Sequence, residues 1–75
     1  MDRSRWILLI KELREEHDVS ILAAERLALA DPRWRRWVDQ QISTDMRCRR
    51  MALQHMRHNG SESLIERDGE RLKVR

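Results

Sequence analysis

The apolar residues in the first two thirds of the chain recur every three or four positions, the spacing typical of amphipathic helices. From Ser4 to about His17, one stripe follows this spacing and consists of Trp6, Leu9, Ile10 and Leu13. A second helix is predicted after Ser20, whose side chain can cap its N-terminus. This segment is mostly Ile, Leu and Ala through residue 29 and holds only two charged residues. We therefore expect it to be the most buried helix.

Two further helices are predicted downstream. Asp31 followed by Pro32 places an N-cap residue before a proline at the first helical position, where the missing N–H costs nothing. The third helix then carries one apolar stripe, made of Trp34, Trp37, Val38 and Ile42. Ser43 and Thr44 offer the N-cap of a fourth helix, and Asn59-Gly60 supplies its stop. Residues 4–60 are thus predicted to be the helical part of the chain.

The C-terminal segment, residues 63–74, has the pattern of a β-hairpin. Asp68-Gly69 is a favoured type I′ turn, and a two-residue loop there places Ile65 opposite Leu72 and sets oppositely charged residues across from each other. A continued helix interrupted at Gly69 is the alternative. Two strands alone are barely stable in water, so the hairpin must dock on the helices or pair with another chain. The expected fold is a single all-α domain over residues 1–75, with about four short helices and a C-terminal β-hairpin.

Two tryptophans stand among arginines in the stretch DPRWRRWVDQQ, residues 31–41. Exposed aromatic rings in a basic context can stack on nucleic-acid bases. Trp34 and Trp37, however, share their helical stripe with Val38 and Ile42. We therefore expect both rings to lie in the core or at an interface with another chain.

The length and the cysteine content narrow the class of protein. A chain of 75 residues buries only ~60% of the surface that its unfolded form exposes, so self-association or a partner can complete its core. The single cysteine, Cys48, cannot form an internal disulfide, which favours a reducing compartment and a cytoplasmic location. The longest apolar run, residues 6–10, is too short for a signal peptide or a membrane-spanning helix. We expect a protein that does not enter membranes.

Positive charge is concentrated in one segment. The chain has 16 basic and 13 acidic residues, but residues 32–59 hold seven arginines and only two aspartates. On a helical wheel of the fourth helix, an apolar side gathers Cys48, Ala52, Leu53 and Met56. Another side carries no acid and gathers Arg47, Arg50, Gln54, Arg57 and His58. Such a stripe suits the neutralisation of phosphates.

Catalytic and metal-binding signals are weak. His55 and His58 lie three positions apart and could share a zinc ion, but a structural site needs four ligands and Cys48 lies about 10 Å along the helix from His55. Cys48 itself falls on the apolar side of its helix, as expected of an inert buried thiol. The two glycines, Gly60 and Gly69, form no phosphate-binding loop. We expect no enzymatic activity, no cofactor and no metal.

Two patches resemble the UBA-like helical segment of bacterial elongation factor Ts. In LIKELREEHDVSILAAERLAL, residues 9–29, a Leu-Arg-Glu helix end at residues 13–15 precedes a turn and an alanine-containing helix. In ALQHMRHNG, residues 52–60, the matching positions are Ala52, Met56, Arg57 and Gly60. The family's turn glycine is replaced by His17-Asp18, and the third helix is an insertion. The resemblance implies a helical hairpin and a module that binds a translation factor or another protein.

Two classes of function remain. The first is a nucleic-acid-binding module that contacts phosphates through Arg47, Arg50 and Arg57, with Arg33 and Arg36 in support if the third and fourth helices pack side by side. The second is a protein-interaction module or a self-associating adaptor that uses Trp34, Trp37 or the edge of the hairpin. An acidic protein surface could also bind the basic face.

Overall fold

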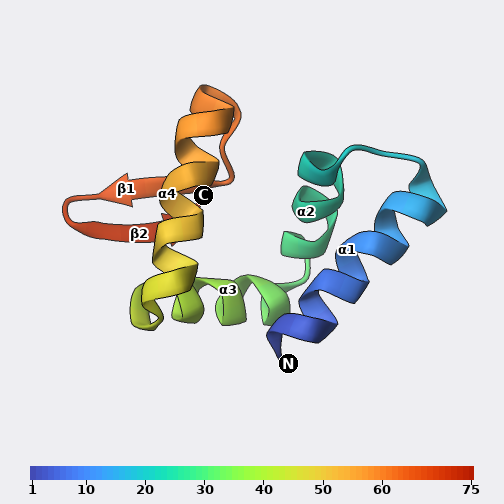
Figure 1. The fold of residues 1–75 in the computed structure, drawn as a ribbon, viewed down its shortest axis with the longest axis horizontal. Coiled ribbons are helices and arrows are strands. Elements are labelled where there is room, and N and C mark those ends of the chain that lie inside the picture. The colour runs from blue at the N-terminus through green and yellow to red at the C-terminus, as the bar shows by residue number, and fades with distance from the viewer. The chain divides into compact units, whose positions relative to one another are not determined.

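The structure is a computed structural model that describes residues 1–75, and it contains four helices followed by a hairpin (Figure 1). The helices are α1 (Arg3–His17), α2 (Ile21–Leu29), α3 (Pro32–Thr44) and α4 (Met46–Asn59). A short 3-10 turn, η1 (Gly60–Glu62), leads from α4 to the antiparallel strands β1 (Ile65–Asp68) and β2 (Arg71–Val74). The predicted fold class, a small all-α fold with a C-terminal β-hairpin, is confirmed.

The chain divides into two compact units, which we call unit 1 (Met1–Arg35) and unit 2 (Arg36–Arg75). Unit 1 contains α1, α2 and the first turn of α3. Unit 2 contains the rest of α3, α4, η1 and the hairpin. The assignment of residues 1–75 to a single domain stays a prediction.

Unit 1 is built on a helical hairpin in which α1 contacts α2 (Figure 1). The buried residues all belong to α2 and are Ala24, Ala28 and Leu29. No residue of α1 is fully buried, although its predicted apolar stripe is half-buried. The small alanine side chains let the two helices approach closely, and α2 is the most buried helix, as predicted.

Two of the predicted helix starts are confirmed by their hydrogen bonds. The Ser20 hydroxyl accepts a hydrogen bond from the backbone N–H of Ala23 across 3.2 Å and caps α2. The Asp31 carboxylate accepts one from the backbone N–H of Arg33 across 2.9 Å, and Pro32 is the first residue of α3. In both cases a polar side chain satisfies an amide that the helix itself leaves without a partner.

Two other predicted helix starts were wrong. The first helix begins one residue before Ser4, because the carboxylate of Asp2 accepts a hydrogen bond from a first-turn amide and caps the helix. The cap of α4 is Asp45, whose carboxylate accepts from two first-turn amides across 2.8 and 3.2 Å. Ser43 and Thr44 instead end α3, and each hydroxyl donates to a backbone carbonyl four residues earlier.

The turn between α1 and α2 depends on Asp18, which adopts the left-handed helical conformation with φ 51° and ψ 54°. Its backbone N–H donates to the carbonyl of Arg14 and closes the C-terminus of α1. Glycine is the usual residue at this position, because a side chain costs free energy there. Aspartate is one of the few other residues that adopt this conformation.

In unit 2 the hairpin docks on the helices of its own chain. Helix α4 contacts both η1 and β1. The small side chain of Ala52 is buried in α4, and the hairpin buries Ile65, Leu72 and Val74. Of the two ways expected to stabilise an isolated hairpin, the structure therefore uses docking within the chain.

The predicted register of the hairpin was wrong. Ile65 lies opposite Val74 rather than Leu72, and the two loop residues are Gly69 and Glu70. Gly69 has a φ of 64°, whereas Glu70 has no positive φ. Glycine at the first central position, with positive φ there alone, is the pattern of a type II′ turn instead of the predicted type I′ turn.

The alternation of apolar and polar residues along the two strands could not have revealed this error. A shift that moves each residue to a partner two positions away leaves every side chain on its original face. The observed register sets two apolar residues, Ile65 and Val74, opposite each other. It also places Glu66 opposite Lys73, whose charged groups lie 3.5 Å apart.

Candidate nucleic-acid interface

Helix α4 presents three exposed arginines on one side. Arg47, Arg50 and Arg57 are all exposed, and we call them the arginine face. The opposite side of the helix carries Ala52 and Met56, which are buried and half-buried. The predicted division of α4 into a packed side and a basic side is therefore confirmed, and docking of the hairpin on one side directs the arginine face outward.

No carboxylate neutralises the arginine face. None of its three side chains forms an ion pair, and α4 contains no acidic residue. The three guanidinium groups are spread over ten positions, which is about 15 Å along a helix. They are available to phosphate groups spaced along a nucleic-acid backbone.

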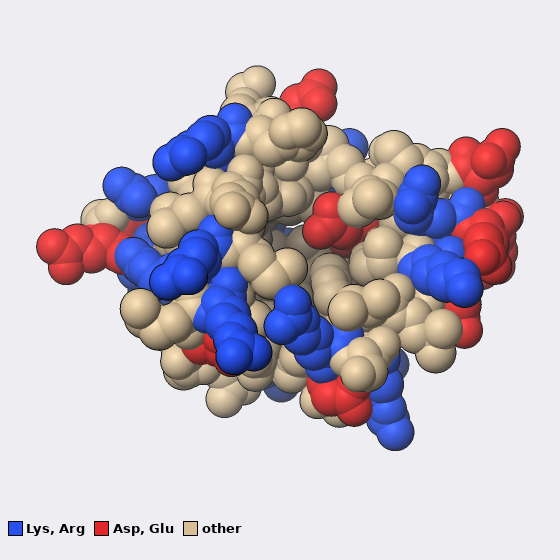
Figure 2. Space-filling model, viewed as in Figure 1, with Lys and Arg blue, Asp and Glu red and all other residues tan.

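Most acidic residues of unit 2 are engaged elsewhere. Asp45 caps α4, and Asp39 accepts a hydrogen bond from the backbone N–H of Val74. Glu66 and Asp68 lie within 4 Å of the charged groups of hairpin side chains. Figure 2 shows Lys and Arg side chains gathered over α4 and the hairpin, with few carboxylates among them. The positive potential of α4 is thus weakly screened by its own unit.

Arg33, expected to support the arginine face, belongs to unit 1 and has a different partner. Its guanidinium group forms an ion pair with the Asp31 carboxylate across 3.2 Å. Hydrogen bonds from Arg33 to this carboxylate lower the pKa of Asp31. Arg33 therefore completes the N-terminal cap of α3.

Arg36 lies in unit 2, where it is exposed and forms no ion pair. Helices α3 and α4 meet at Asp45 instead of packing along their lengths (Figure 1). Arg36 is eight residues before the end of α3, which is about 12 Å along the helix. The structure thus brings Arg47, Arg50 and Arg57 together on one helix but does not add Arg36 to them.

The two tryptophans of α3 belong to different units, and both are half-buried. The ring of Trp34 lies 5.6 Å from the ring of Trp6, centre to centre, at an interplanar angle of 49°. This distance is typical of aromatic pairs that pack in protein cores. Trp34 therefore contributes to the packing of unit 1, in keeping with its place on an apolar stripe.

The hairpin offers few edge groups to another strand. The backbone N–H of Val74 points away from β1 and donates to the Asp39 carboxylate across 2.6 Å. On the outer edge of β1, both backbone groups of Ile65 bind the hydroxyl of the buried residue Ser63. This hydroxyl donates to the Ile65 carbonyl and accepts from the Ile65 N–H. Each edge is thus occupied at one of its outward positions, which disfavours addition of a further strand.

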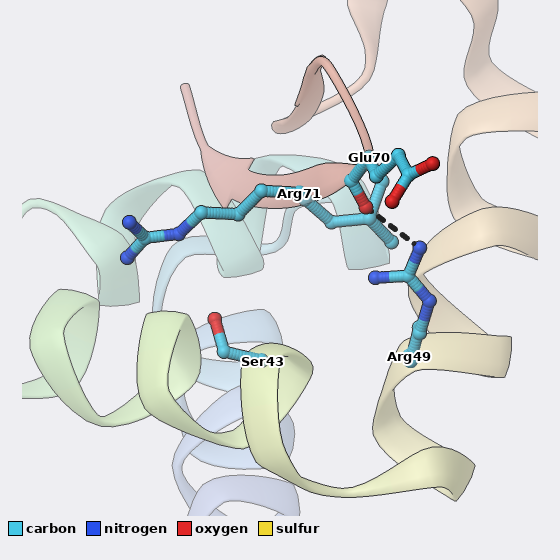
Figure 3. A pocket seen from close by; sticks show the side chains of 5 residues that line it. Ser43, Arg49, Glu70 and Arg71 are labelled. Atoms are coloured by element: carbon cyan, nitrogen blue, oxygen red, sulfur yellow. Dashed lines mark hydrogen bonds between the residues drawn. The ribbon is translucent and has the colours of Figure 1, made fainter.

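A shallow pocket of about 370 Å³ lies between α3, α4 and the hairpin turn. It is lined by Ser43, Arg49, Glu70, Arg71 and Leu72. The Arg49 guanidinium donates to the backbone carbonyl of Glu70 across 2.9 Å, whereas the Arg71 side chain extends away from Arg49 to the other side of the pocket (Figure 3). The two guanidinium groups therefore do not converge on one anion.

Sequence reasoning missed the tethering role of Arg49. On the helical wheel it lies on the apolar side of α4, between Met56 and Leu53, but periodicity does not identify its partner. Its contact depends on where the hairpin turn falls, and the predicted register placed that turn one residue too early. No signal in the sequence identifies this hydrogen bond.

The two histidines of α4 have different surroundings. His58 is exposed, whereas His55 is half-buried and accepts a hydrogen bond from the backbone N–H of Leu64 across 3.1 Å. Nowhere do three His, Cys, Asp or Glu side chains come together in a group that could hold a metal ion. Cys48 is a free, half-buried thiol. None of the four helices combines the length and the apolar character needed to cross a membrane.

Comparison of the chain with protein-family models, characterised proteins and solved structures found no match. The two patches that resemble elongation factor Ts lie in different units, one on α1 and α2 and the other at the end of α4. That resemblance stays a prediction.

Proposed function

We propose that the protein is a non-enzymatic nucleic-acid-binding module that contacts phosphates through the arginine face. The observation that carries this proposal is the presence of Arg47, Arg50 and Arg57, exposed and without ion pairs, on a helix that has no acid. A guanidinium group binds phosphate through two parallel hydrogen bonds. Binding releases counterions from the nucleic acid, so affinity falls steeply with salt.

The distribution of charge between the two units also supports binding through the arginine face. Unit 1 has seven basic and seven acidic residues, whereas unit 2 has nine basic and six acidic residues. The positive surplus of the protein therefore belongs to the unit that carries the arginine face. Such a local surplus increases the rate at which a polyanion associates. The free thiol of Cys48 is consistent with a reducing compartment, and we place this activity in the cytoplasm.

The test is binding of the full chain to fluorescent DNA and RNA at several salt concentrations. We expect the triple variant R47Q/R50Q/R57Q to bind more weakly and to reduce the slope of log K against log salt by about 2 to 3. The matched control is K11Q/R14Q/R26Q, which removes the same charge from exposed positions of unit 1. Equal affinities of the two variants, or no binding by the unmodified chain at low salt, would contradict the proposal.

A second candidate, protein interaction, rests on unit 1. Five large apolar side chains there are 45–58% exposed, and they are Met1, Ile7, Leu8, Ile21 and Leu27. A unit of 35 residues is smaller than most domains that fold without a partner, disulfide or metal. Sedimentation of the full chain over a range of concentrations tests self-association. A monomer at every concentration would remove self-association from this candidate.

A further inference from the structure

Resting on the proposed function, we infer that the nucleic acid is double-stranded DNA and that α4 enters its major groove, with Arg50 and Gln54 at the base edges. The inference arises from one additional residue on the exposed side of α4. Gln54 follows Arg50 by four positions and precedes Arg57 by three, so the three side chains are neighbours on the helix surface. The amide is thus placed inside the arginine face.

The shape of α4 suits the major groove. A wide arc of the helix is exposed, and it includes Met46, Arg47, Arg50, Met51, Gln54, Arg57 and His58. A helix with side chains is about 10–12 Å across, and the major groove of B-form DNA is about 12 Å wide. The hairpin covers only the opposite side, where Ala52 is buried. The exposed side can therefore approach the bases without a clash from β1 or η1.

The side chains on this arc match the groups that base edges present. Arginine forms two hydrogen bonds with guanine, and glutamine forms two with adenine. The side chain of Gln54 is exposed and has no hydrogen-bond partner in the protein, so both ends of its amide are available. A purely phosphate-binding surface would gain little from a neutral amide among its arginines. The combination of Gln54 and Arg50 is typical of a surface that distinguishes base pairs.

The capping of α4 determines where along the helix such contacts occur. Helix N-termini commonly bind phosphate through their free amides. Here the Asp45 carboxylate occupies the amides of Arg47 and Cys48 and places a negative charge at that end. Base contacts are therefore expected from the middle of α4, at Arg50 and Gln54. Arg47 and Arg57 then flank them and contact the phosphates on either side.

Other forms of nucleic acid fit this surface less well. Proteins that bind single strands stack the bases on aromatic side chains, and α4 has no Trp, Tyr or Phe. The one tryptophan of unit 2, Trp37, lies on α3 and is half-buried. Double-stranded RNA has a deep and narrow major groove that does not admit a helix. These features favour duplex DNA.

The experiment compares the full chain, Q54A and the matched control Q40A, which removes an exposed amide from α3. Each protein is titrated with duplex DNA, single-stranded DNA of the same sequence and duplex RNA at one salt concentration. Each is then used to select sequences from a randomised DNA duplex. We expect at least about tenfold tighter binding to duplex DNA and a preferred sequence for the unmodified chain and for Q40A. In Q54A, discrimination at one base pair should fall about 5- to 150-fold, with an unchanged salt slope.

Three results would overturn the inference but leave the proposed function in place. They are equal or tighter binding to single strands or duplex RNA, a selection with no preferred base, and an unchanged preference in Q54A. Failure of the unmodified chain to bind any nucleic acid would overturn both. Circular dichroism of Q54A confirms that the helices are intact before these results are read.

Discussion

The backbone N–H of Leu64 donates a hydrogen bond to Nε2 of His55 across 3.1 Å. This contact joins α4 to the residue that immediately precedes β1. The Nε2 atom must be unprotonated to accept the hydrogen bond from Leu64. Burial lowers the pKa of His55, and the neighbouring charge of His58 lowers it further.

We expect the stability of the hairpin to depend on the protonation of His55. The folded pKa lies below that of the unfolded chain, which is about 6.5, so acid protonates the unfolded chain first. The contribution of neutral His55 to the free energy of unfolding is therefore complete above about pH 6.5 and is lost as the pH falls through the folded pKa. Amide hydrogen exchange at Leu64 and the Tm, measured at about pH 8 and pH 5, test this dependence.

The variant H55Q keeps an acceptor oxygen but cannot titrate, so its Tm should fall less between the two pH values than that of the unmodified chain. H17Q removes an exposed histidine at the end of α1 and should leave the pH dependence unchanged. A fall in Tm that is the same in H55Q and in the unmodified chain would show that His55 does not control this transition.

Asp39 tethers the last strand to α3. Its Oδ1 atom accepts a hydrogen bond from the backbone N–H of Val74, 35 residues away in sequence, at 2.6 Å. D39A leaves this N–H without its partner in a partly buried position, so we expect the free energy of unfolding to fall by about 1 to 3 kcal/mol. D39N retains an acceptor oxygen and should lose less. Urea denaturation measures both variants, and equal stability of D39A and the unmodified chain would exclude the tether.

Asp18 holds a backbone conformation that glycine adopts at lower cost. With φ 51° and ψ 54°, an aspartate there is destabilised by about 1 kcal/mol relative to glycine. D18G should therefore raise the free energy of unfolding by roughly this amount, less the extra entropy that glycine gives the unfolded chain. D18A retains a side chain at the same φ and should not be stabilised. Thermal denaturation compares the three proteins. A D18G protein less stable than the unmodified chain would contradict the claim that the left-handed conformation of Asp18 costs free energy.

The candidate site was predicted in part. The periodicity of α4 separates Arg47, Arg50 and Arg57 from the apolar side, and the structure exposes all three. The role expected of Arg33 depended on side-by-side packing of α3 and α4, which does not occur, and its guanidinium group binds Asp31. The contacts of Asp39 and His55 with the hairpin were missed, because each partner is a backbone amide that no side-chain pattern marks.

The sequence by itself determined the elements of local origin. The existence of the four helices, the caps at Ser20 and Asp31 and the stop at Gly60 follow from interactions among residues two to four positions apart, which the order of residues contains directly. The tertiary structure decided the hairpin register, because shifting partners by two positions preserves both faces. It also decided the tethers between α3, α4 and the hairpin. These depend on the meeting of distant segments, for which local periodicity carries no information.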